Sequence, residues 1–487
     1  MNFDQFKKLA SSYTAIPVYR VLLADTLTPV SVFLKLRQAG TMPFLLESVE
    51  GGEKLARYSF IGMNPFRVLS YADSQTNLKE GGTDTNLDGN FYDILQQYTD
   101  AYKEPRLPEL PHFTAGAVGY SSYDTVRITE KLPDPPPDDL KIPEAVWAFY
   151  DEVYAFDHVK HRILIIKTVR IDVDFPDLQT MFDLANNRLD SMQDVLSSSD
   201  GKPGVLQIDT ANIRSNIDKA RFGTMVEKAK HHIYEGDIFQ VVLSQRFSTS
   251  YQGDRFMIYR ALRMVNPSPY MFYLDFSDFA LIGASPEVLV RVINKKVEVL
   301  PIAGTRPRGL SYEEDLANEQ DLMKDEKELA EHIMLVDLGR NDLSRICKPR
   351  SVQVTRSHAI ERYSHVMHIV SNVEGELDDH STAVDALRYC FPAGTVSGAP
   401  KVRAMQIIDQ LEPTRRGPYA GAVGYFDFSG NMDTCIAIRT MVATDTELHI
   451  QAGAGIVADS IPENEFKETV NKAKALMESI HVSLKLN

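Results

Sequence analysis

The stretch AVWAFYDEVYAFD, residues 145–157, is an apolar and alternating run with the period of two that is typical of β-strands. A second run of this kind, RILIIKTVRIDVDF, occupies residues 162–175. Together they predict paired antiparallel strands. The first half of the chain is therefore expected to be rich in strands, with one helix at residues 177–196.

The second half mixes helical and strand patterns without strict alternation. Helical periodicity occurs in IDKARFGTMVEKAKHHIYEG (217–236) and DLMKDEKELAEHIMLVDLGR (321–340), and strand patterns occur in VEVLPIAGT (297–305) and ELHIQAGAGIV (447–457). Strictly alternating βαβ units would indicate a parallel sheet, and their absence here favours an α+β fold. We expect antiparallel sheets around a cleft, with helices on the outside.

Two segments have the composition of linkers between domains. LPDPPPDDLKIPE (132–144) is rich in proline and carboxylates, and SSSDGKPG (197–204) is a Ser/Gly/Pro linker. They predict a division near residue 200. We expect an N-terminal region at 1–200 and a second domain at 211–480.

Length, composition and charge limit the classes to which the protein can belong. The 487 residues suggest about two to four domains or one large composite fold. No apolar run is long enough to span a bilayer, and MNFDQFKKLA does not have the pattern of a secretory signal, so we expect a cytoplasmic protein without membrane association. Three widely spaced cysteines indicate reduced, buried thiols. A net charge of −15 without a basic cluster disfavours nucleic-acid binding.

Two predicted helices carry acidic pairs. Glu328 and Glu331 lie three residues apart beside an apolar stripe of Leu322, Leu329, Ile333 and Val336. Glu465 and Glu468 share a face after a predicted capping box of Ser460 and Glu463. From the pattern alone, each pair is either a solvated helix face or half of a metal site. If the two helices meet, oxygen ligands without Cys or His suit Mg²⁺.

Two glycine-rich segments could approach an anion. FPAGTVSGAPK (391–401) places Lys401 at the start of a predicted helix, and QAGAGIVADS (451–460) has Gly453 and Gly455 after a strand. Each is equally compatible with an ordinary tight turn. The loop spacing of the first segment excludes a Walker-type nucleotide site.

Three single residues are candidates for chemistry, each with a structural alternative. His368 lies in an apolar run and is either a core histidine or a catalyst. Glu287 follows a Ser-Pro turn, where it is either a surface residue or a carboxyl with a raised pKa at the mouth of a strand. Arg439 interrupts an apolar strand-like run and requires an anion or a carboxylate partner.

A set of long motifs, in order, resembles the chorismate-utilising enzymes, in particular the large subunits of anthranilate synthase. The motifs cover residues from about 40 to about 475. They are LLES, NPSPYMFYLDF, LIGASPEVLV, PIAGTRPRG, ELAEHIMLVDLGRNDLSRI, FPAGTVSGAPKVRAMQIIDQLE, RGPYAGAVGYFDFSGNMDTCIAIRT and GAGIVADSIPENEFKET. The resemblance implies an α+β fold of antiparallel sheets around a cleft, which agrees with the reading of the patterns.

The resemblance also implies roles for individual residues. Glu331 and Glu468 would bind Mg²⁺, which holds the ring carboxylate of chorismate. The implied catalytic residues are Glu287 as general acid, with His368 and Thr395 at the reacting centre. The implied substrate-binding residues, together with Lys401, are Gly304, Thr305, Tyr419, Arg439, Gly453, Ala454 and Gly455.

Two positions distinguish activities within the family. Members that make 4-amino-4-deoxychorismate have a lysine nucleophile where this chain has Ala303, and isochorismate producers have a lysine base where it has Gln240. With neither lysine, the resemblance implies that ammonia adds directly at C2 of chorismate and that pyruvate is then lost. The product would be anthranilate, in the first step of tryptophan biosynthesis.

The resemblance further implies a partner and an inhibitor. None of the three cysteines lies in a Gly-x-Cys-x-Gly elbow, so a separate glutamine amidotransferase subunit would supply ammonia, in a hetero-oligomer of two large and two small subunits. The residues matching the tryptophan feedback site are Ser48, Pro269, Tyr270 and Met271. The alternatives are an aminodeoxychorismate synthase component I and a non-catalytic tryptophan sensor.

Overall fold

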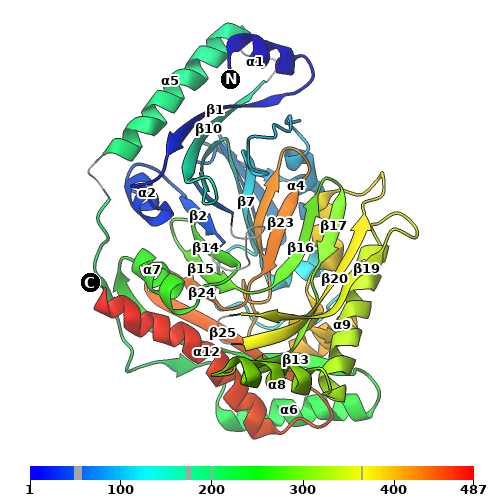
Figure 1. Cartoon of the computed structure of the whole chain (residues 1–487). Coiled ribbons are helices and arrows are strands. Elements are labelled where there is room, and N and C mark those ends of the chain that lie inside the picture. Colours follow the sequence, from blue (N-terminus) through cyan, green and yellow to red (C-terminus); the bar gives the residue numbers. More distant parts are fainter. Residues whose placement is uncertain (49–56, 172–176, 199–200, 364–365, 487) are drawn as a thin grey trace.

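The computed structural model describes residues 1–48, 57–171, 177–198, 201–363 and 366–486. Neighbouring strands pair in antiparallel fashion and form two large sheets, and helices cover the outer faces (Figure 1). The predicted α+β class with antiparallel sheets is therefore confirmed. The last residues of the quoted run 162–175 and part of the linker 197–204 lie outside the described residues.

The first sheet has 13 strands in the described residues. Its order is β1 (Ala15–Leu23), β10 (Arg162–Arg170), β9 (Glu152–Asp157), β3 (Tyr58–Gly62), β2 (Phe44–Glu47), β14 (Tyr270–Asp275), β15 (Ala280–Ser285), β24 (Thr440–Ala443), β25 (Glu447–Ile456), β13 (Gln240–Gly253) and β11 (Leu206–Ile208), with β12 (Arg214–Ser215) and β21 (Gly398–Ala399) beside β13.

The second sheet has 12 strands in the same described part of the chain. Its order is β18 (Ile302–Pro307), β20 (Val366–Glu376), β17 (Lys296–Val299), β16 (Val288–Ile293), β23 (Met432–Ile436), β22 (Ala422–Asp427), β7 (Gly116–Ser121), β8 (Ala145–Tyr150), β4 (Arg67–Ala72), β5 (Gln75–Glu80) and β6 (Thr83–Leu87), with β19 (Gln353–Arg362) beside β20.

Helices lie outside these sheets. The α-helices are α1 (Phe3–Ala10), α2 (Pro29–Leu36), α4 (Phe91–Thr99), α5 (Leu178–Ser197), α6 (Lys219–Tyr234), α7 (Phe256–Val265), α8 (Tyr312–Leu322), α9 (Glu326–Ser344), α10 (Ala383–Cys390), α11 (Lys401–Leu411) and α12 (Pro462–Lys485), and two 3₁₀ turns are η1 (Tyr123–Ile128) and η2 (Gly394–Val396). The predicted helix at 177–196 is α5, and the one at 217–236 is α6.

The stretch 145–157 connects the two sheets, because β8 belongs to the second sheet and β9 to the first. β9 pairs with β10 in antiparallel register, with Ile165 opposite Tyr154, as the two runs predict. β8 is buried on both faces: Trp147 and Phe149 pack in an outer core, and Val146 and Ala148 pack between the sheets. Period-two alternation thus separates two apolar layers rather than a wet face from a dry one.

The predicted division near residue 200 separates two parts of the sequence that share both sheets. In the first sheet β2 pairs with β14, with Leu45 opposite Tyr273. In the second sheet β22 pairs with β7, with Gly424 opposite Gly119. Strand pairing continues across the division, so each half completes the sheets of the other. The resemblance assigns regulation and partner contact to residues 1–200 and chorismate binding and catalysis to residues 211–480, and these roles stay predictions.

The helix expected at 321–340 is two helices. α8 ends at Leu322, and Asp325 caps α9 by accepting hydrogen bonds from the backbone N–H groups of Lys327 and Glu328 at 3.1 and 3.2 Å. The expected apolar stripe is wrong only at Ile333, which is 50% exposed, since Leu322 is buried and Leu329 and Val336 pack against the cores. α9 also buries His332 and Leu335, which the stripe did not include.

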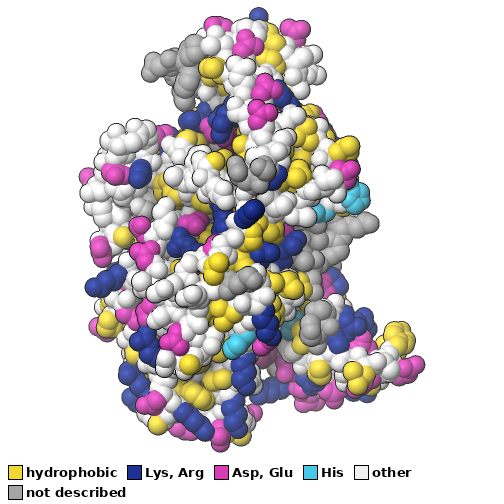
Figure 2. Space-filling view, turned by 90° about the vertical axis from the view of Figure 1, so that its left-hand side faces the viewer, with side chains coloured by type: hydrophobic (Ala, Val, Ile, Leu, Met, Phe, Trp, Pro, Cys, Tyr) yellow, Lys and Arg dark blue, Asp and Glu magenta, His cyan; other side chains and the backbone are white. Residues whose placement is uncertain are grey.

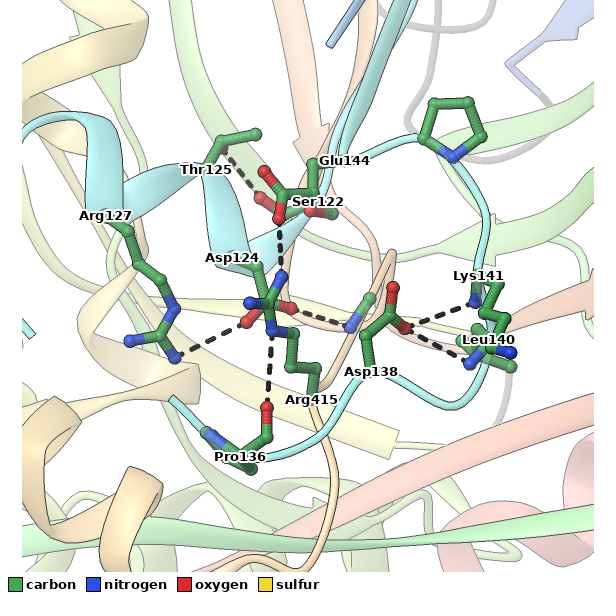
Figure 3. A network of polar contacts seen from close by, with 12 residues as sticks. Ser122, Asp124, Thr125, Arg127, Pro136, Asp138, Leu140, Lys141, Glu144 and Arg415 are labelled. Atoms are coloured by element: carbon green, nitrogen blue, oxygen red, sulfur yellow. Dashed lines mark hydrogen bonds and ion pairs between the residues drawn. The ribbon is translucent and has the colours of Figure 1, made fainter. Parts of the chain in front are cut away.

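The proline-rich segment 132–144 has no regular structure, as predicted, but side chains from the second half of the chain hold it (Figure 3). Arg415 donates to the carbonyl of Pro136 at 3.3 Å and to the Glu144 carboxylate at 2.6 Å. Asp138 accepts from the backbone N–H groups of Leu140 and Lys141 within the segment. The segment is therefore an anchored crossing rather than a free linker.

The surface and the cysteines fit the composition. On the face drawn in Figure 2, positive and negative side chains are interspersed. Among the described residues, the helices include none with the length and apolarity needed to cross a membrane. All three cysteines are free and buried, which confirms the prediction for them.

Candidate active site

Glu287 lies between β15 and β16, at the strand mouth that the sequence predicts. Its Oε2 accepts a hydrogen bond from the Thr395 hydroxyl at 3.1 Å. Burial raises the pKa of the Glu287 carboxyl, and the Thr395 bond and the positive charges of Arg439 and Lys472 oppose this rise. The result is a carboxyl group that keeps its proton to a higher pH than an exposed glutamate does.

His368 lies on β20 opposite Thr305 of β18. Its Nδ1 lies 2.8 Å from the carbonyl oxygen of Gly304 and 3.1 Å from the Thr305 hydroxyl. A carbonyl oxygen only accepts, so Nδ1 carries the hydrogen, and in the neutral ring Nε2 is the basic nitrogen. Burial lowers the pKa of His368 and the charge of Arg439 lowers it further, while the bond to the Gly304 carbonyl opposes this change; the lowered pKa favours the neutral form.

Arg439 connects these two groups electrostatically, since its charge acts on both Glu287 and His368. We expected Arg439 to interrupt a strand. It lies instead in the connection between β23 and β24, with a φ of 48°. β23 and β24 belong to different sheets, and the backbone bends at Arg439 in the connection between them. The guanidinium is thereby placed where both sheets contribute residues.

Glycines bring the backbone close to these side chains. Gly304 has a φ of 68°, at a bulge where the pairing of β18 with β20 shifts. A Cβ atom on Gly304 would come within 2.9 Å of Leu322, so both the backbone conformation and the space favour glycine. A Cβ atom on Gly453 would lie 2.7 Å from the Tyr419 hydroxyl, which places this buried tyrosine over β25.

We expected a turn after a strand at residues 453–455. The structure has Gly453, Ala454 and Gly455 within strand β25. They pair with Ser244, Leu243 and Val242 of β13. A Cβ atom on Gly455 would lie 2.7 Å from Nε2 of Gln240. The small residues therefore form a flat strand surface between Tyr419 and Gln240.

The four acidic candidates divide between α9 and α12. Glu331 accepts a hydrogen bond from Nε2 of Gln240 at 3.1 Å, and Glu468 pairs with Lys472 at 2.7 Å. Burial, and next the charge of Glu331, raise the pKa of Glu328. Burial raises the pKa of Glu465 and the charge of Glu468 adds to it, while Lys327 of α9 opposes the rise. The starts of α9 and α12 are thus within electrostatic reach of each other.

The chemistry of these carboxylates would suit a magnesium ion that takes only some of its ligands from the protein. The described residues contain no group of three or more His, Cys, Asp and Glu side chains that could hold a metal. Mg²⁺ commonly takes one or two protein carboxylates and completes its shell with water and substrate oxygens. Two glutamates and excess negative charge at the helix starts match that requirement.

Two sequence interpretations near these helices change. The Ser460 hydroxyl accepts from the backbone N–H of Val457 at 3.0 Å, and α12 begins at Pro462 after Ile461, so the expected capping box is wrong. The Lys401 ammonium bonds to Asp342 at 2.8 Å and to the carbonyl of Cys390 at 3.3 Å. Its charge therefore has an internal anion as partner, and its role toward a substrate stays a prediction.

Sequence reasoning missed Lys472. Its ammonium lies 3.1 Å from the carbonyl oxygen of Gly453 and 2.7 Å from Glu468, and its charge acts on Glu287. The signal was present, because Lys472 stands four residues after Glu468 on a predicted helix, where the two side chains share a face. The spacing alone describes an ordinary surface ion pair, however, and only the fold brings it to β25.

The four residues matched to the feedback site come together in a separate cavity of about 380 Å³. Ser48, Pro269, Tyr270 and Met271 line it. The Ser48 hydroxyl is buried and makes no hydrogen bond to the residues that the structure describes. Tyr270 donates to Asp433 at 2.8 Å across the cavity wall. The cavity thus offers apolar walls, charged groups and one unused hydroxyl, as a site for a small amphipathic ligand requires.

Comparison with known proteins agrees with this architecture. Residues 42–478 match the family model described as chorismate binding enzyme. The anthranilate synthase component 1 of Acetivibrio thermocellus is 48% identical over 487 residues, covering 98% of both chains. That of Aquifex aeolicus is 46% identical, covering 99% of this chain and 98% of the relative. The chain therefore belongs to the chorismate binding enzyme family, and the prediction that it is an enzyme of this family is confirmed.

Solved structures share the fold. Anthranilate synthase component I from Streptococcus pneumoniae superposes with a TM-score of 0.79 at 38% identity, covering 93% of this chain and 98% of the other. The menaquinone-specific isochorismate synthase from Escherichia coli superposes with a TM-score of 0.71 at 20% identity, covering 98% of both chains. The second similarity concerns the fold alone.

Proposed function

We propose that the chain is the large subunit of an anthranilate synthase and converts chorismate and ammonia to anthranilate and pyruvate through 2-amino-2-deoxyisochorismate. The observation that supports the proposal is that the charge of Arg439 acts on both Glu287 and His368, with Ala303 on the strand that pairs with that of His368. The similarity to anthranilate synthase component 1 over nearly the whole chain supports it.

Chorismate carries two carboxylates, and the site offers a cation for each. Arg439 is placed to pair with the enolpyruvyl carboxylate, and Glu331 and Glu468 would hold a Mg²⁺ ion. When bound, that ion neutralises the ring carboxylate and fixes the ring. One dication and one guanidinium thereby offset a dianionic ligand in a protein with a net charge of −15.

The first half of the reaction uses Glu287. Its carboxyl gives a proton to the C4 hydroxyl, which leaves as water, while ammonia forms a bond to C2. The raised pKa of Glu287 supplies the protonated form, and the Thr395 hydroxyl stabilises the carboxylate that remains. Ammonia is already a good nucleophile, so the neutral amide of Gln240 suffices beside its path.

The second half uses His368. Nε2 of the neutral ring takes the proton from C2 as the bond between C3 and the enolpyruvyl oxygen breaks. This leaves an aromatic ring and the enolate of pyruvate, which takes up a proton on its methylene carbon to give pyruvate. The Nδ1 bond to the Gly304 carbonyl orients the ring and stabilises the imidazolium that forms. Tyr419 and the flat surface of β25 exclude water from this side.

Ala303 should be a determinant of the position at which ammonia is added. Ala303 is 9% exposed, and it pairs with Ile369, one residue from His368. We expect Ala303→Lys to lower the rate of anthranilate formation at least about tenfold, because the amine competes for C2. Ala303→Met adds similar length without an amine and should lose less. Full anthranilate formation by the lysine variant, measured by fluorescence, would contradict this account.

We further propose that tryptophan binds in the cavity lined by Ser48 and Tyr270 and inhibits the enzyme. We expect Ser48→Phe to raise the tryptophan inhibition constant at least about tenfold at unchanged kcat, since the ring occupies space that the ligand needs. Ser48→Ala removes only the unused hydroxyl and should have a smaller effect. Inhibition of the phenylalanine variant at wild-type concentrations of tryptophan would place the effector elsewhere.

The ammonia source is a separate glutamine amidotransferase, in a cytoplasmic assembly that we propose to contain two large and two small subunits. Purified chain with chorismate, Mg²⁺ and an ammonium salt should form anthranilate and pyruvate without a partner. Glutamine should replace ammonium only after the amidotransferase is added. A non-aromatic amino product would favour an aminodeoxychorismate synthase, and tryptophan binding without turnover would favour a sensor.

A further inference from the structure

Ser285 lies between the effector cavity and the reacting centre. It is the last residue of β15 and is completely buried. Its backbone pairs with Tyr270, which lines the cavity, and Glu287 follows two residues later in the chain. One short segment therefore has a cavity residue on one side and the proposed general acid on the other.

The Ser285 hydroxyl fixes this segment to the opposite sheet. It lies 2.7 Å from the carbonyl oxygen of Ile436 on β23 and 3.4 Å from that of Glu287. A hydroxyl has one proton, so it donates to the nearer carbonyl of Ile436. The same oxygen accepts from the backbone N–H of Glu287 at 3.3 Å. The hydroxyl thus joins the backbone of Glu287 to β23.

β23 is itself a wall of the effector cavity. Asp433 and Cys435 line the cavity, and Asp433 accepts the hydrogen bond from Tyr270. The Cys435 thiol contacts the Ser285 hydroxyl, and the N–H of Ile436 donates to the carbonyl of Glu287 at 3.0 Å. A ligand that moves β14 relative to β23 therefore acts on both partners of Ser285.

The neighbouring residue extends the connection to the second charged group. The backbone N–H of Ala284 donates to the carbonyl of Arg439 at 3.1 Å. Glu287 and Arg439 are thus both attached to the Ala284–Ser285 dipeptide. Because this dipeptide is fully buried among close-packed strands, a displacement on the cavity side cannot be absorbed locally.

We propose that Ser285 is a positioning residue that couples the effector cavity to the placement of Glu287 and Arg439. The proposal rests on the proposed function, in which the cavity binds tryptophan and Glu287 is the general acid. In this arrangement a bound ligand changes the substrate site through the Ser285 hydroxyl, without touching the substrate itself. The coupling is a free energy between two sites and acts equally in both directions.

The test measures that coupling by calorimetry. The tryptophan Kd is determined for the full chain with and without saturating chorismate, in the absence of ammonium, and the ratio of the two values is the coupling factor. Ser285→Ala should bind tryptophan alone within about threefold of wild type, while the coupling factor falls at least about fivefold towards one. Ser285→Cys replaces the hydroxyl with a weak S–H donor, so its coupling factor should lie between those of wild type and Ser285→Ala.

Thr434→Val is the matched control. Its hydroxyl, also fully buried, donates to the carbonyl of Val290 on β16 at 2.8 Å, so it joins β23 to a neighbouring strand and not to the backbone of Glu287. The control should keep the wild-type factor. An unchanged factor in Ser285→Ala, or an equal loss in Thr434→Val, overturns the proposal. If the wild-type protein binds no tryptophan, the proposed regulation fails and this inference fails with it. The titration of the wild-type protein alone shows that outcome, so it is distinct from a failure of the Ser285 coupling.

Discussion

Glu287→Gln should lower kcat for anthranilate formation by about 10²- to 10⁴-fold, the usual contribution of a positioned general acid. Glutamine keeps the shape of the side chain and its bond to Thr395, but it has no proton to give to the departing hydroxyl. Chorismate binding should change little, because Glu287 is not the partner proposed for either carboxylate. The measurement is anthranilate fluorescence with ammonium as the nitrogen donor, and Glu235→Gln at the exposed end of α6 is the control.

The pH dependence gives this prediction a second readout. A general acid must be protonated, and burial raises the pKa of Glu287, so activity is present at low pH and is lost as the pH rises through that pKa. Thr395→Val removes the hydrogen bond that stabilises the ionised carboxyl, so this loss should move to a higher pH. A Glu287→Gln variant with wild-type kcat, or with the same loss of activity as the pH rises, would assign the proton to another group.

Glu331→Gln and Glu468→Gln should each weaken Mg²⁺ binding and lower kcat/KM by about 100-fold or more, since even the loss of an outer partner of a metal ligand costs 10- to 100-fold. Each change removes one negative charge from the site where a dication is expected. Binding of Mn²⁺ as a spectroscopic probe, measured by paramagnetic resonance with and without chorismate, reports on the ion separately from turnover.

The chain contains the controls for this pair of changes. Glu328 lies on α9 with Glu331, and Glu465 lies on α12 with Glu468. Glu328→Gln and Glu465→Gln remove the same charge from the same helices and should keep Mn²⁺ binding within about threefold. If these two variants lose the ion and the other two retain it, the ligands are wrongly assigned. If all four retain it, Mg²⁺ binds elsewhere or not at all.

The sequence was sufficient for the fold class, because period-two runs such as 145–157 and 162–175 fix strand type and antiparallel partners locally. It was not sufficient for the assignment of strands to sheets. β8 and β9 are separated by a single residue, Asp151, yet they belong to different sheets. Strand assignment depends on contacts with segments far away in the chain, such as β4 and β3, and local periodicity carries no information about them.

The candidate residues show the same division. Motif resemblance selected Glu287, His368 and Arg439, and in the structure the charge of Arg439 acts on each of the other two. It did not find Lys472, since an ion pair four residues apart on a helix has the same pattern on any surface. The apolar pattern around Arg439 wrongly placed it inside a strand, because local hydrophobicity does not report the bend with a positive φ that this residue makes between β23 and β24.

The sequence by itself determined the types of element, the chemical groups available and the absence of a lysine at positions 303 and 240, since these are local properties of the chain. Only the tertiary structure decided which groups meet. It orients the His368 ring through the Gly304 carbonyl, brings α12 to β25 through Lys472, and places Ser285 between two sites. The physical reason is that hydrogen bonds and burial between distant segments depend on how the two sheets pack, and packing is a property of the whole chain.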